Sequence, residues 1–402
     1  MDGTDLMRRR LLLVPDGMAD EPQMALGGRT PLEAAHTPFM DGLARGGVVG
    51  RARTVPQGMP AGSDVANLAV LGYDPAAVFT GRSPLEAASI GVELGPHDVA
   101  YRLNFVTVAG GLMKDNTAGH LSDEEGRRLV AALRDALGGG PYEFHAGVSY
   151  RNLMVWRGGE VVPCTPPHDI LDRPVAGCLP GEAAGCGQTD AARALSELLA
   201  RADDVLAGLR PHTNAWFWGE GTAPRMPSFR DLYGLRGAVV AAVDLVRGIG
   251  RLAGMDVLDV PGATGGLDTD YGAKARAAVA ALKEYDLVWV HVEAPDEAGH
   301  MGDLREKVRA IERVDAEVLG PILQSNVRVA AMVLPDHYTP LATRTHSDPP
   351  VPFVISEPAP GLGGGGAMEF GESDAAATGL LVESGPELMR LFLEATGHPL
   401  GW

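Results

Sequence analysis

Three short apolar segments, each closely followed by an acidic residue, constrain the fold of this chain more than any other feature. They cover residues 11–15, 286–292 and 327–334, and the next residue or the next but one is Asp or Glu. Apolar runs of this length, alternating with helical patterns, are typical of an α/β protein with a mainly parallel sheet. Because sites in open parallel sheets form at the carboxyl ends of the strands, we expect functional residues to follow these segments.

The middle of the chain, residues 86–232, has a different pattern. A strand-like segment at 101–108 is followed by a helical pattern over 122–137, a region rich in Pro, Gly and Cys, and a further helix and strand. We interpret this stretch as a smaller α/β domain inserted into the first domain. The core domain would then consist of residues 1–85 and 233–402.

The overall charge narrows the range of partners. The formal net charge of the 402 residues is −18, so we expect neither nucleic acid nor an anionic membrane surface as a partner. No apolar run approaches the roughly 20 residues of a membrane span. An acidic protein can still bind a small phosphorylated metabolite where arginine, lysine or metal ions reverse the local charge. The sequence leaves the oligomeric state open.

The cysteines indicate a reducing compartment. Cys164, Cys178 and Cys186 form neither a Cys-x-x-Cys pair nor an even set, which is typical of cytoplasmic proteins. The apolar segment near the N-terminus, residues 11–15, is too short for a signal peptide, and Asp16 follows it at once. We therefore expect a cytoplasmic protein.

Seven residues that suit metal binding or nucleophilic attack lie at predicted strand ends or helix starts. Two of them, Asp296 and His300, are four positions apart, so on one helical turn their side chains reach the same point. Asp336 and His337 are adjacent on a loop after a predicted strand. Ser63 begins a helical pattern, and the N-terminus of a helix favours phosphate. The full set is Asp16, Ser63, Asp296, His300, Asp336, His337 and His346.

This combination of residues points to phosphoryl transfer with two metal ions. Two divalent cations about 4 Å apart hold the attacking and leaving oxygens of an in-line displacement. Such cations need carboxylates to balance their charge and neutral imidazoles as ligands. Taken singly, each residue is more often a helix cap, a turn residue or a surface residue. Their conjunction at one sheet edge favours an enzyme with Ser63 as a covalent nucleophile over a non-catalytic binding protein.

The order Asp, Ser, Asp-x-x-x-His, Asp-His, His resembles that of the alkaline phosphatase superfamily. Within this superfamily, the chain is similar to the archaeal-type cofactor-independent phosphoglycerate mutases. The segments that carry the resemblance follow one another in the same order and span nearly the whole chain. They are GRTPLEAAHTPFMDGLARGG (28–47), GSDVANLAVLGYDP (62–75), GRSPLEAASIG (81–91), GATG (262–265) and HSDPPVP (346–352).

The resemblance implies a fold, a reaction and a set of metal ligands. The fold would be an alkaline-phosphatase-like, mainly parallel sheet flanked by helices, with a smaller transferase-like α/β domain inserted. Ser63 would take the phosphate of 3-phosphoglycerate as phosphoserine and return it to the 2-position without 2,3-bisphosphoglycerate. The two metal ions would be Mn²⁺ by family preference, with Mg²⁺, Co²⁺ or Zn²⁺ as alternatives. One would be bound by Asp296, His300 and His346, and the other by Asp16, Ser63, Asp336 and His337.

A substrate with a phosphate and a carboxylate calls for arginine side chains that can form two parallel hydrogen bonds. Histidines can assist them as further donors. The candidate substrate-binding residues are Arg82, Arg102, Arg151 and Arg225, together with His120 and His168.

Three segments depart from the pattern of the archaeal mutases. DNTAGH (115–120) stands in place of an arginine-rich segment, SDVAN (63–67) in place of Ser-Asp-Thr-Ala-His, and WGEG (218–221) in place of Arg-Gly-Ala-Gly. These variants resemble a bacterial branch of the family that has been proposed to phosphorylate homoserine. Because Glu220 or Asp115 would suit the ammonium group of that acceptor, a phosphotransferase to an amino-alcohol is the alternative function.

Overall fold

The chain forms two compact units in the computed structural model. Unit 1 consists of Met1–Phe79 and Met226–Trp402, and unit 2 is Thr80–Arg225. The predicted domain boundaries, 85/86 and 232/233, lie a few residues further along the chain. Cys186 falls outside the described residues, which are 9–182, 189–356 and 369–398.

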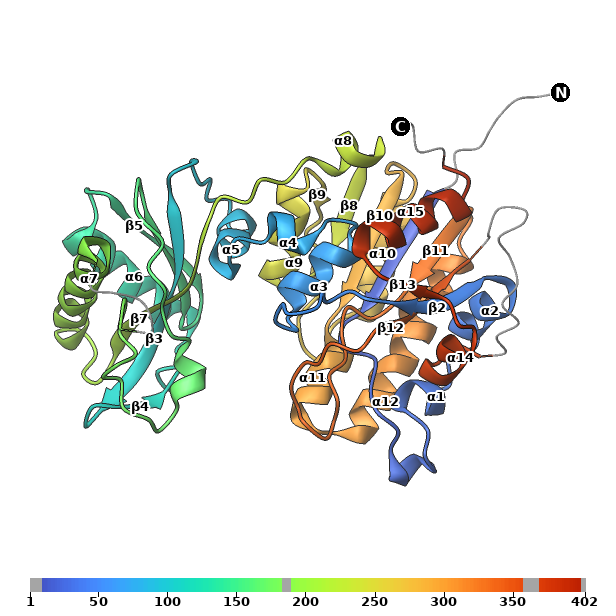
Figure 1. Cartoon of the computed structure of the whole chain (residues 1–402), viewed down its shortest axis with the longest axis horizontal. Helices are drawn as coiled ribbons and strands as arrows, with labels where there is room; N and C mark the ends of the chain where they lie inside the picture. The colour runs from blue at the N-terminus through green and yellow to red at the C-terminus, as the bar shows by residue number, and fades with distance from the viewer. Residues whose placement is uncertain (1–8, 183–188, 357–368, 399–402) are drawn as a thin grey trace. The chain divides into compact units, whose positions relative to one another are not determined.

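Unit 1 is built around an eight-stranded sheet with the order β13-β2-β12-β11-β1-β10-β8-β9 (Figure 1). Five neighbouring strands, from β11 to β9, are parallel, whereas β12 is antiparallel to both of its neighbours. The mainly parallel sheet predicted from the sequence is therefore confirmed. The strands are β1 (Arg9–Pro15), β2 (Val48–Ala52), β8 (Gly237–Val240), β9 (Asp256–Val257), β10 (Leu287–Val292), β11 (Val329–Val333), β12 (Val351–Ile355) and β13 (Leu381–Val382).

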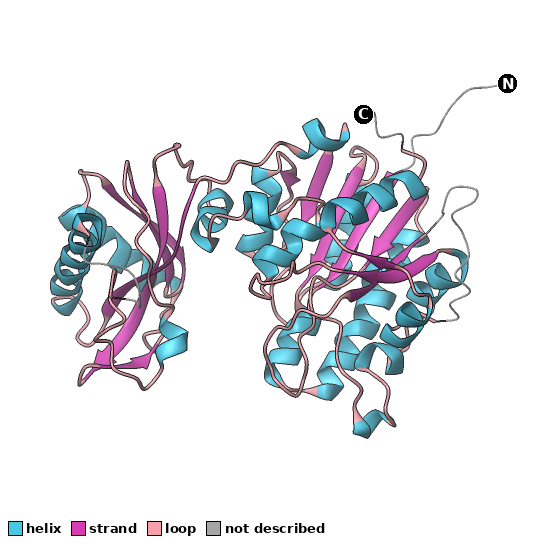
Figure 2. Cartoon of the chain, viewed as in Figure 1, coloured by secondary structure: helices cyan, strands magenta, loops and turns pink. Residues whose placement is uncertain are grey.

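The three central strands, β10, β1 and β11, coincide with the three apolar segments of the sequence. They lie side by side and parallel, and every residue of β10 and β11 is buried. Helices cover both faces of the sheet (Figure 2), which explains why these strands are continuously apolar rather than alternating. The fold thus places the ends of all three strands at one edge.

Two groups of helices flank this sheet. The helices α2, α10 and α12 and the π-helical turn η3 (Val314–Leu319) pack against the face that presents Leu11 and Leu13. In a second group, helix α3 contacts both α9 and α15. The helices of unit 1 are α1 (Pro31–Ala34), α2 (Pro38–Gly46), α3 (Ser63–Val70), α4 (Pro75–Val78), α8 (Phe229–Tyr233), α9 (Asp244–Leu252), α10 (Tyr271–Ala281), α11 (Ala294–Met301), α12 (Leu304–Arg313), α13 (Gly320–Leu323), α14 (Glu372–Ala377) and α15 (Gly385–Ala395), with the short 3-10 turn η1 (Met24–Leu26).

Unit 2 has a five-stranded antiparallel sheet with two long helices packed on one face. Leu129 of α6 and Leu195 of α7 lie in one buried cluster with Tyr101 and Phe105 of β3. The strand predicted at 101–108 falls within β3, and the helix predicted at 122–137 corresponds to α6, which begins one residue later. The elements are β3 (Val99–Ala109), β4 (Leu112–Asp115), β5 (Tyr142–Val148), β6 (Arg151–Trp156), β7 (Asn214–Thr222), α5 (Arg82–Ser89), α6 (Asp123–Leu137), α7 (Asp190–Ala207) and η2 (Pro167–Ile170).

Local sequence explains where the long helix α6 starts. Ser122 precedes it in extended conformation and accepts a hydrogen bond from the backbone N–H of Glu125, whose side chain accepts one from the backbone of Ser122. This capping box satisfies two amide groups that the first helical turn leaves unpaired. In the described parts of both units, none of the helices combines the length and the apolar character needed to cross a membrane.

Candidate active site

The carboxyl ends of the central strands gather acidic and imidazole side chains in unit 1. β1 is followed by Asp16, β10 by Glu293, and β11 by a loop that contains Asp336 and His337. The register pairs Pro15, the last residue of β1, with Val292, the last residue of β10, so the two strands end at the same edge of the sheet. Residues far apart in the sequence therefore meet at one edge, as the parallel sheet requires.

Asp16, Asp336 and His337 form the first cluster, which we call the buried ligand group. One potential ligand atom from each lies within 4.8 Å of the other two. His337 Nε2 is 3.6 Å from Asp16 Oδ1 and 3.4 Å from Asp336 Oδ2, and the side chains are at most 7% exposed. Burial lowers the pKa of His337, which favours the neutral ring that metal ions bind.

Hydrogen bonds fix the carboxylate of Asp336. Its Oδ1 accepts hydrogen bonds from the backbone N–H groups of Gly17, at 3.1 Å, and of His337, at 2.9 Å. Its Oδ2 accepts one from Nδ2 of Asn67 in α3, at 2.8 Å. Three donors from three parts of the chain thus set the direction of one carboxylate.

The buried ligand group has the composition of a site for a divalent cation. Burial raises the pKa of Asp16, and the charges of Asp336 and Asp296 raise it further. Asp16 Oδ1 is buried and makes no hydrogen bond to any described residue. Carboxylates this close and this dry need a counter-charge, and mixed oxygen and imidazole ligands suit Mn²⁺ or Zn²⁺.

Asp296, His300 and His346 form the second cluster, which we call the open ligand group. The helix α11 places Asp296 and His300 one turn apart, with His300 Nε2 3.1 Å from Asp296 Oδ2 and 3.0 Å from His346 Nε2. The imidazole side chains are 37% and 23% exposed. Hydrogen bonding to Asp296 raises the pKa of His300 to about 9.

Backbone carbonyls orient the two imidazoles of the open ligand group. His300 Nδ1 lies 2.9 Å from the carbonyl oxygen of Arg344, and His346 Nδ1 lies 3.1 Å from that of Ala61. A carbonyl oxygen only accepts, so each Nδ1 carries the hydrogen. Each Nε2 is therefore the ring nitrogen that points into the site, and a metal ion bound there would displace the hydrogen that His300 Nε2 donates to Asp296.

The two ligand groups adjoin through His337. Its ring stacks on that of His346 with a centroid distance of 3.9 Å, and it lies within 4.8 Å of ligand atoms of Asp296 and His346. Ser63, the first residue of α3, has its Oγ 3.0 Å from His337 Nε2. The structure thus brings all seven predicted metal or nucleophile residues together within unit 1.

Sequence reasoning missed a buried polar chain behind Asp16. His291 Nε2 lies 3.5 Å from Asp16 Oδ2, and its Nδ1 lies 3.3 Å from Glu293 Oε1. Glu293 in turn pairs with Lys274 Nζ at 2.7 Å. A histidine inside the otherwise apolar strand LVWVHV was the available signal, because buried polar groups need partners.

The candidate substrate-binding residues all lie in unit 2, and three of them form a first subset. Arg102 pairs with Glu86 at 3.0 Å and lies 4.5 Å from the ring centre of Trp218. Arg82 also pairs with Glu86, at 3.2 Å. The ring centroids of His168 and Trp218 are 5.1 Å apart in an edge-to-face arrangement. This first subset is built around a buried guanidinium.

The remaining candidates in unit 2 are Arg151, His120 and Arg225. Arg151 and His120 both contact the ring of Tyr150, at 5.7 and 6.5 Å. Arg225 is exposed at the end of the unit. The charge of Arg151 helps to lower the pKa of Arg102, so Arg151 lies close to the first subset.

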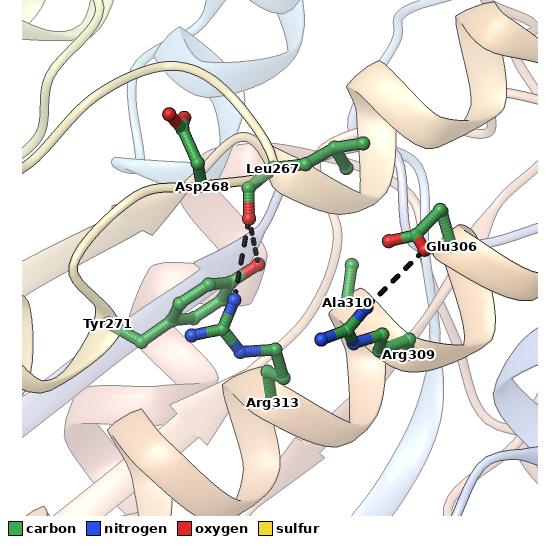
Figure 3. Close-up of a pocket in the computed structure, with 7 residues that line it drawn as sticks. All are labelled: Leu267, Asp268, Tyr271, Glu306, Arg309, Ala310 and Arg313. Atoms are coloured by element: carbon green, nitrogen blue, oxygen red, sulfur yellow. Dashed lines mark hydrogen bonds and ion pairs between the residues drawn. The ribbon is translucent and has the colours of Figure 1, made fainter.

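A surface pocket of unit 1 is separate from both ligand groups (Figure 3). Its guanidinium groups already have partners, because Arg313 pairs with Glu317 at 2.7 Å and stacks on Tyr271 at 4.0 Å. The lining residues are Leu267, Asp268, Tyr271, Glu306, Arg309, Ala310 and Arg313. None of them belongs to the candidate site.

Solved structures of similar sequence share the fold across the whole chain. A protein from Pyrococcus horikoshii is 30% identical, with a TM-score of 0.81 and 98% of this chain and 99% of that chain covered. The cofactor-independent phosphoglycerate mutase from Thermoplasma acidophilum is 27% identical, with a TM-score of 0.65 and coverage of 97% and 100%.

Sequence relatives match over nearly the full length. A probable 2,3-bisphosphoglycerate-independent phosphoglycerate mutase of Geobacter sulfurreducens is 49% identical over 96% of this chain and 99% of its own. The corresponding mutase of Methanothrix thermoacetophila is 46% identical over 95% and 99%. The profile of the same family matches residues 44–210. The chain belongs to the family of 2,3-bisphosphoglycerate-independent phosphoglycerate mutases.

Proposed function

We propose that the chain interconverts 3-phosphoglycerate and 2-phosphoglycerate through a phosphoserine on Ser63, without 2,3-bisphosphoglycerate. The observation that carries the proposal is the position of Ser63 Oγ, 3.0 Å from His337 Nε2, where the two ligand groups adjoin. The names of the relatives support the same reaction. The cysteine usage supports a cytoplasmic location for it.

Two divalent metal ions are part of the proposal, with Mn²⁺ expected by family resemblance. The buried ligand group and Ser63 would hold one ion, and the open ligand group would hold the other. The buried oxygen of Asp16 that makes no hydrogen bond to a described residue supports this assignment, as do the inward-pointing Nε2 atoms of His300 and His346. When bound, the ions would lower the pKa of the serine hydroxyl and neutralise charge on the phosphoryl group.

The reaction would take place in two displacements at Ser63. In the first, the serine oxygen attacks phosphorus, and the bond between phosphorus and the 3-oxygen of the glycerate breaks, with a proton moving to that oxygen. In the second, the 2-hydroxyl oxygen attacks the phosphoserine and regenerates the serine hydroxyl. The N-terminus of α3 would favour the phosphate at this position.

Unit 2 would supply the groups that bind the anionic substrate. Arg102 is the strongest candidate because it is only 5% exposed and is held in place by Glu86 and Trp218. A guanidinium fixed in this way can form two parallel hydrogen bonds to a carboxylate or phosphate. Arg82, Arg151, Arg225, His120 and His168 remain candidates for the same role.

The alternative function, phosphate transfer to an amino-alcohol such as homoserine, gains no support from the relatives. One of its two supporting residues is also occupied. The carboxylate of Asp115 accepts hydrogen bonds from the backbone N–H groups of Thr117 and Gly119 and from the Thr117 hydroxyl. It stabilises its own loop and has little capacity left for a ligand ammonium group.

Loss of the Ser63 hydroxyl tests the proposed function. With Mn²⁺, 3-phosphoglycerate and enolase as coupling enzyme, the wild-type protein should turn over without added bisphosphoglycerate, and Ser63→Ala should not. Mass spectrometry of acid-quenched enzyme should find phosphate on Ser63. Ser373→Ala is the matched control, because Ser373 lies in the first turn of another helix of unit 1 and is exposed. Wild-type turnover by Ser63→Ala would refute the covalent mechanism.

A further inference from the structure

Thr339 lies between the two ligand groups and contacts both. It is fully buried on the loop after β11, two residues beyond His337. Its Oγ1 is 2.5 Å from Oδ1 of Asp296 in the open ligand group and 3.3 Å from Nδ1 of His337 in the buried ligand group. One hydroxyl therefore bridges a carboxylate and an imidazole that come from different strand ends.

The hydrogen of that hydroxyl can serve only one partner. A carboxylate accepts hydrogen bonds and donates none, so the short contact to Asp296 uses the hydrogen of Thr339 Oγ1. Towards His337, Oγ1 can then act only as an acceptor. For the contact at 3.3 Å to be a hydrogen bond, Nδ1 of His337 must carry the ring hydrogen, which leaves Nε2 with its lone pair facing Ser63.

The surroundings hold Thr339 in this orientation. A Cβ atom on Gly17, whose φ is +58°, would lie 2.5 Å from both Thr339 Oγ1 and Asp296 Oδ1. A Cβ atom on Gly299 would lie 2.7 Å from the Thr339 carbonyl oxygen and 2.8 Å from its Cγ2. Lys307 Nζ donates to the same carbonyl oxygen at 2.7 Å. Two glycines leave room for the side chain, and a buried ammonium fixes its backbone.

We propose that Thr339 is a positioning residue that holds His337 with its hydrogen on Nδ1, and so keeps Nε2 available to a divalent cation beside Ser63. The inference rests on the proposed function insofar as His337 and Asp296 are metal ligands. It adds that one hydroxyl couples the two ligand sets, because the group that fixes the His337 tautomer also fixes Asp296. A partner on the far ring nitrogen is how proteins generally orient ligating histidines.

The simplest competing explanation is that Thr339 only fills space in the core. Valine has the same shape without the hydroxyl, and serine keeps the hydroxyl without the methyl group. If packing is its role, Thr339→Val should behave like the wild-type protein and Thr339→Ser should be the defective variant. If the hydroxyl positions His337, Thr339→Val should be the defective variant and Thr339→Ser should behave like the wild-type protein.

The ring tautomer can be measured without any reaction. In protein labelled with ¹⁵N-histidine and treated with EDTA, the nitrogen shifts of His337, assigned by their absence in His337→Gln, should be those of a ring with hydrogen on Nδ1. Thr339→Val should change them, and Thr339→Ser should restore them. Hydrogen on Nε2 in the wild-type protein would overturn the proposal, and this result does not depend on the folding of a Thr339 variant.

Metal affinity gives the second readout. Calorimetric titration with Mn²⁺ should show binding weakened about 10- to 100-fold in Thr339→Val, the usual cost of losing such an outer partner, and largely recovered in Thr339→Ser. Wild-type Mn²⁺ affinity in a folded Thr339→Val variant would contradict the proposal. A protein with the expected tautomer and Mn²⁺ affinity but no mutase turnover would leave this inference standing and remove the proposed function.

Discussion

The buried and open ligand groups provide the same kinds of atoms but are held in different ways. In the buried ligand group, the carboxylate of Asp336 takes three hydrogen bonds from two backbone amides and one side chain. In the open ligand group, His300 and His346 each depend on one carbonyl oxygen of a loop and remain partly exposed. Strand ends and backbone amides set the geometry of the buried group, whereas helix α11 and two loop carbonyls set that of the open group.

This difference has consequences for metal exchange. A ligand set buried between strand ends can change its geometry only if the core moves, because interiors are close-packed. A set whose two imidazoles are partly exposed and oriented by loop carbonyls can open locally at little cost in free energy. If each group binds one ion, we expect the ion in the open ligand group to exchange faster and to bind more weakly.

The largest expected effect comes from the buried ligand group. Asp336→Asn should lower mutase turnover about 10⁴-fold, because the amide removes a charge and presents a donor to groups that already donate. His346→Gln should weaken metal binding while leaving the site intact. A titration of turnover against Mn²⁺ should therefore rescue His346→Gln and not Asp336→Asn. Equal rescue of both variants would show that the two groups do not differ in this way.

The next effect concerns Lys307 and Asp20, a fully buried ion pair whose ammonium also donates to the carbonyl oxygen of Thr339 beside the open ligand group. Lys307 Nζ pairs with Asp20 Oδ2 at 2.7 Å, and neither side chain is exposed. Lys307→Met should lower the free energy of unfolding by about 3–5 kcal/mol, because it leaves Asp20 buried without its counter-charge. Chemical denaturation of metal-free protein measures this change.

A neighbouring cation provides the control for this measurement. Arg309 lies on the same helix, and its side chain is 66% exposed. Arg309→Met should change the free energy of unfolding by less than about 0.5 kcal/mol. Similar losses for both variants would mean that helix α12 as a whole, and not the buried pair, sets the stability of this region.

A substitution at Gly17 tests the contact between Thr339 and Asp296, which joins the two ligand groups. The φ of +58° at Gly17 and the two oxygens 2.5 Å from any Cβ leave no room for a side chain. Gly17→Ala should displace Asp296 or Thr339 and lower turnover about 10²-fold. Gly27→Ala is the control, since φ is +70° there but no atom lies within 4 Å of a Cβ. Backbone strain is common to both variants, so equal losses of activity would argue against the steric explanation.

The sequence predicts the ligand residues of this site and the strand ends that carry them better than the residues that orient those ligands. The strand ends and the four-residue spacing of Asp296 and His300 follow from local patterns, and the structure places them at one sheet edge. The antiparallel direction of β12 was not predicted, because the run VPFVI has the same apolar pattern in either direction. Lys307 gave no signal, since one polar residue in a helix is usually exposed. Asn67 stands out in the sequence only as a departure from the family pattern, not as a partner of Asp336.

The residues that orient the ligands cannot be predicted from the sequence, for a physical reason. Thr339 matters only because Gly17, Asp296 and His337 approach it from three separate segments, and a single sequence does not show such distances. The glycine positions are the nearest thing to a clue. A positive φ beside a strand end marks a close approach of backbone to a side chain, but it does not say which side chain.

The smallest expected effect uses Asp315 as a reference for the buried ligand group. This carboxylate is also buried, but two backbone amides, those of Phe39 and Met40, satisfy it without a cation. Burial raises its pKa to about 6 from an ordinary value of 3.8. Because the folded state holds the proton more tightly, the contribution of Asp315 to stability is greatest below pH 4 and declines as the pH rises to about 6.

Acidification from pH 7 to pH 5 should therefore stabilise the metal-free wild-type protein through this group by about 1 kcal/mol. Asp315→Asn should remove that part of the pH dependence, whatever its effect on stability at pH 7. Urea unfolding of both proteins at the two pH values isolates the contribution, because the titrations of the ligand groups are common to both and cancel. If both proteins show the same change between pH 5 and pH 7, backbone amides alone suffice to keep a buried carboxylate ionised. The clearest difference between the two carboxylates would then be that Asp315 accepts hydrogen bonds from two amides, whereas Oδ1 of Asp16 accepts none from any described residue.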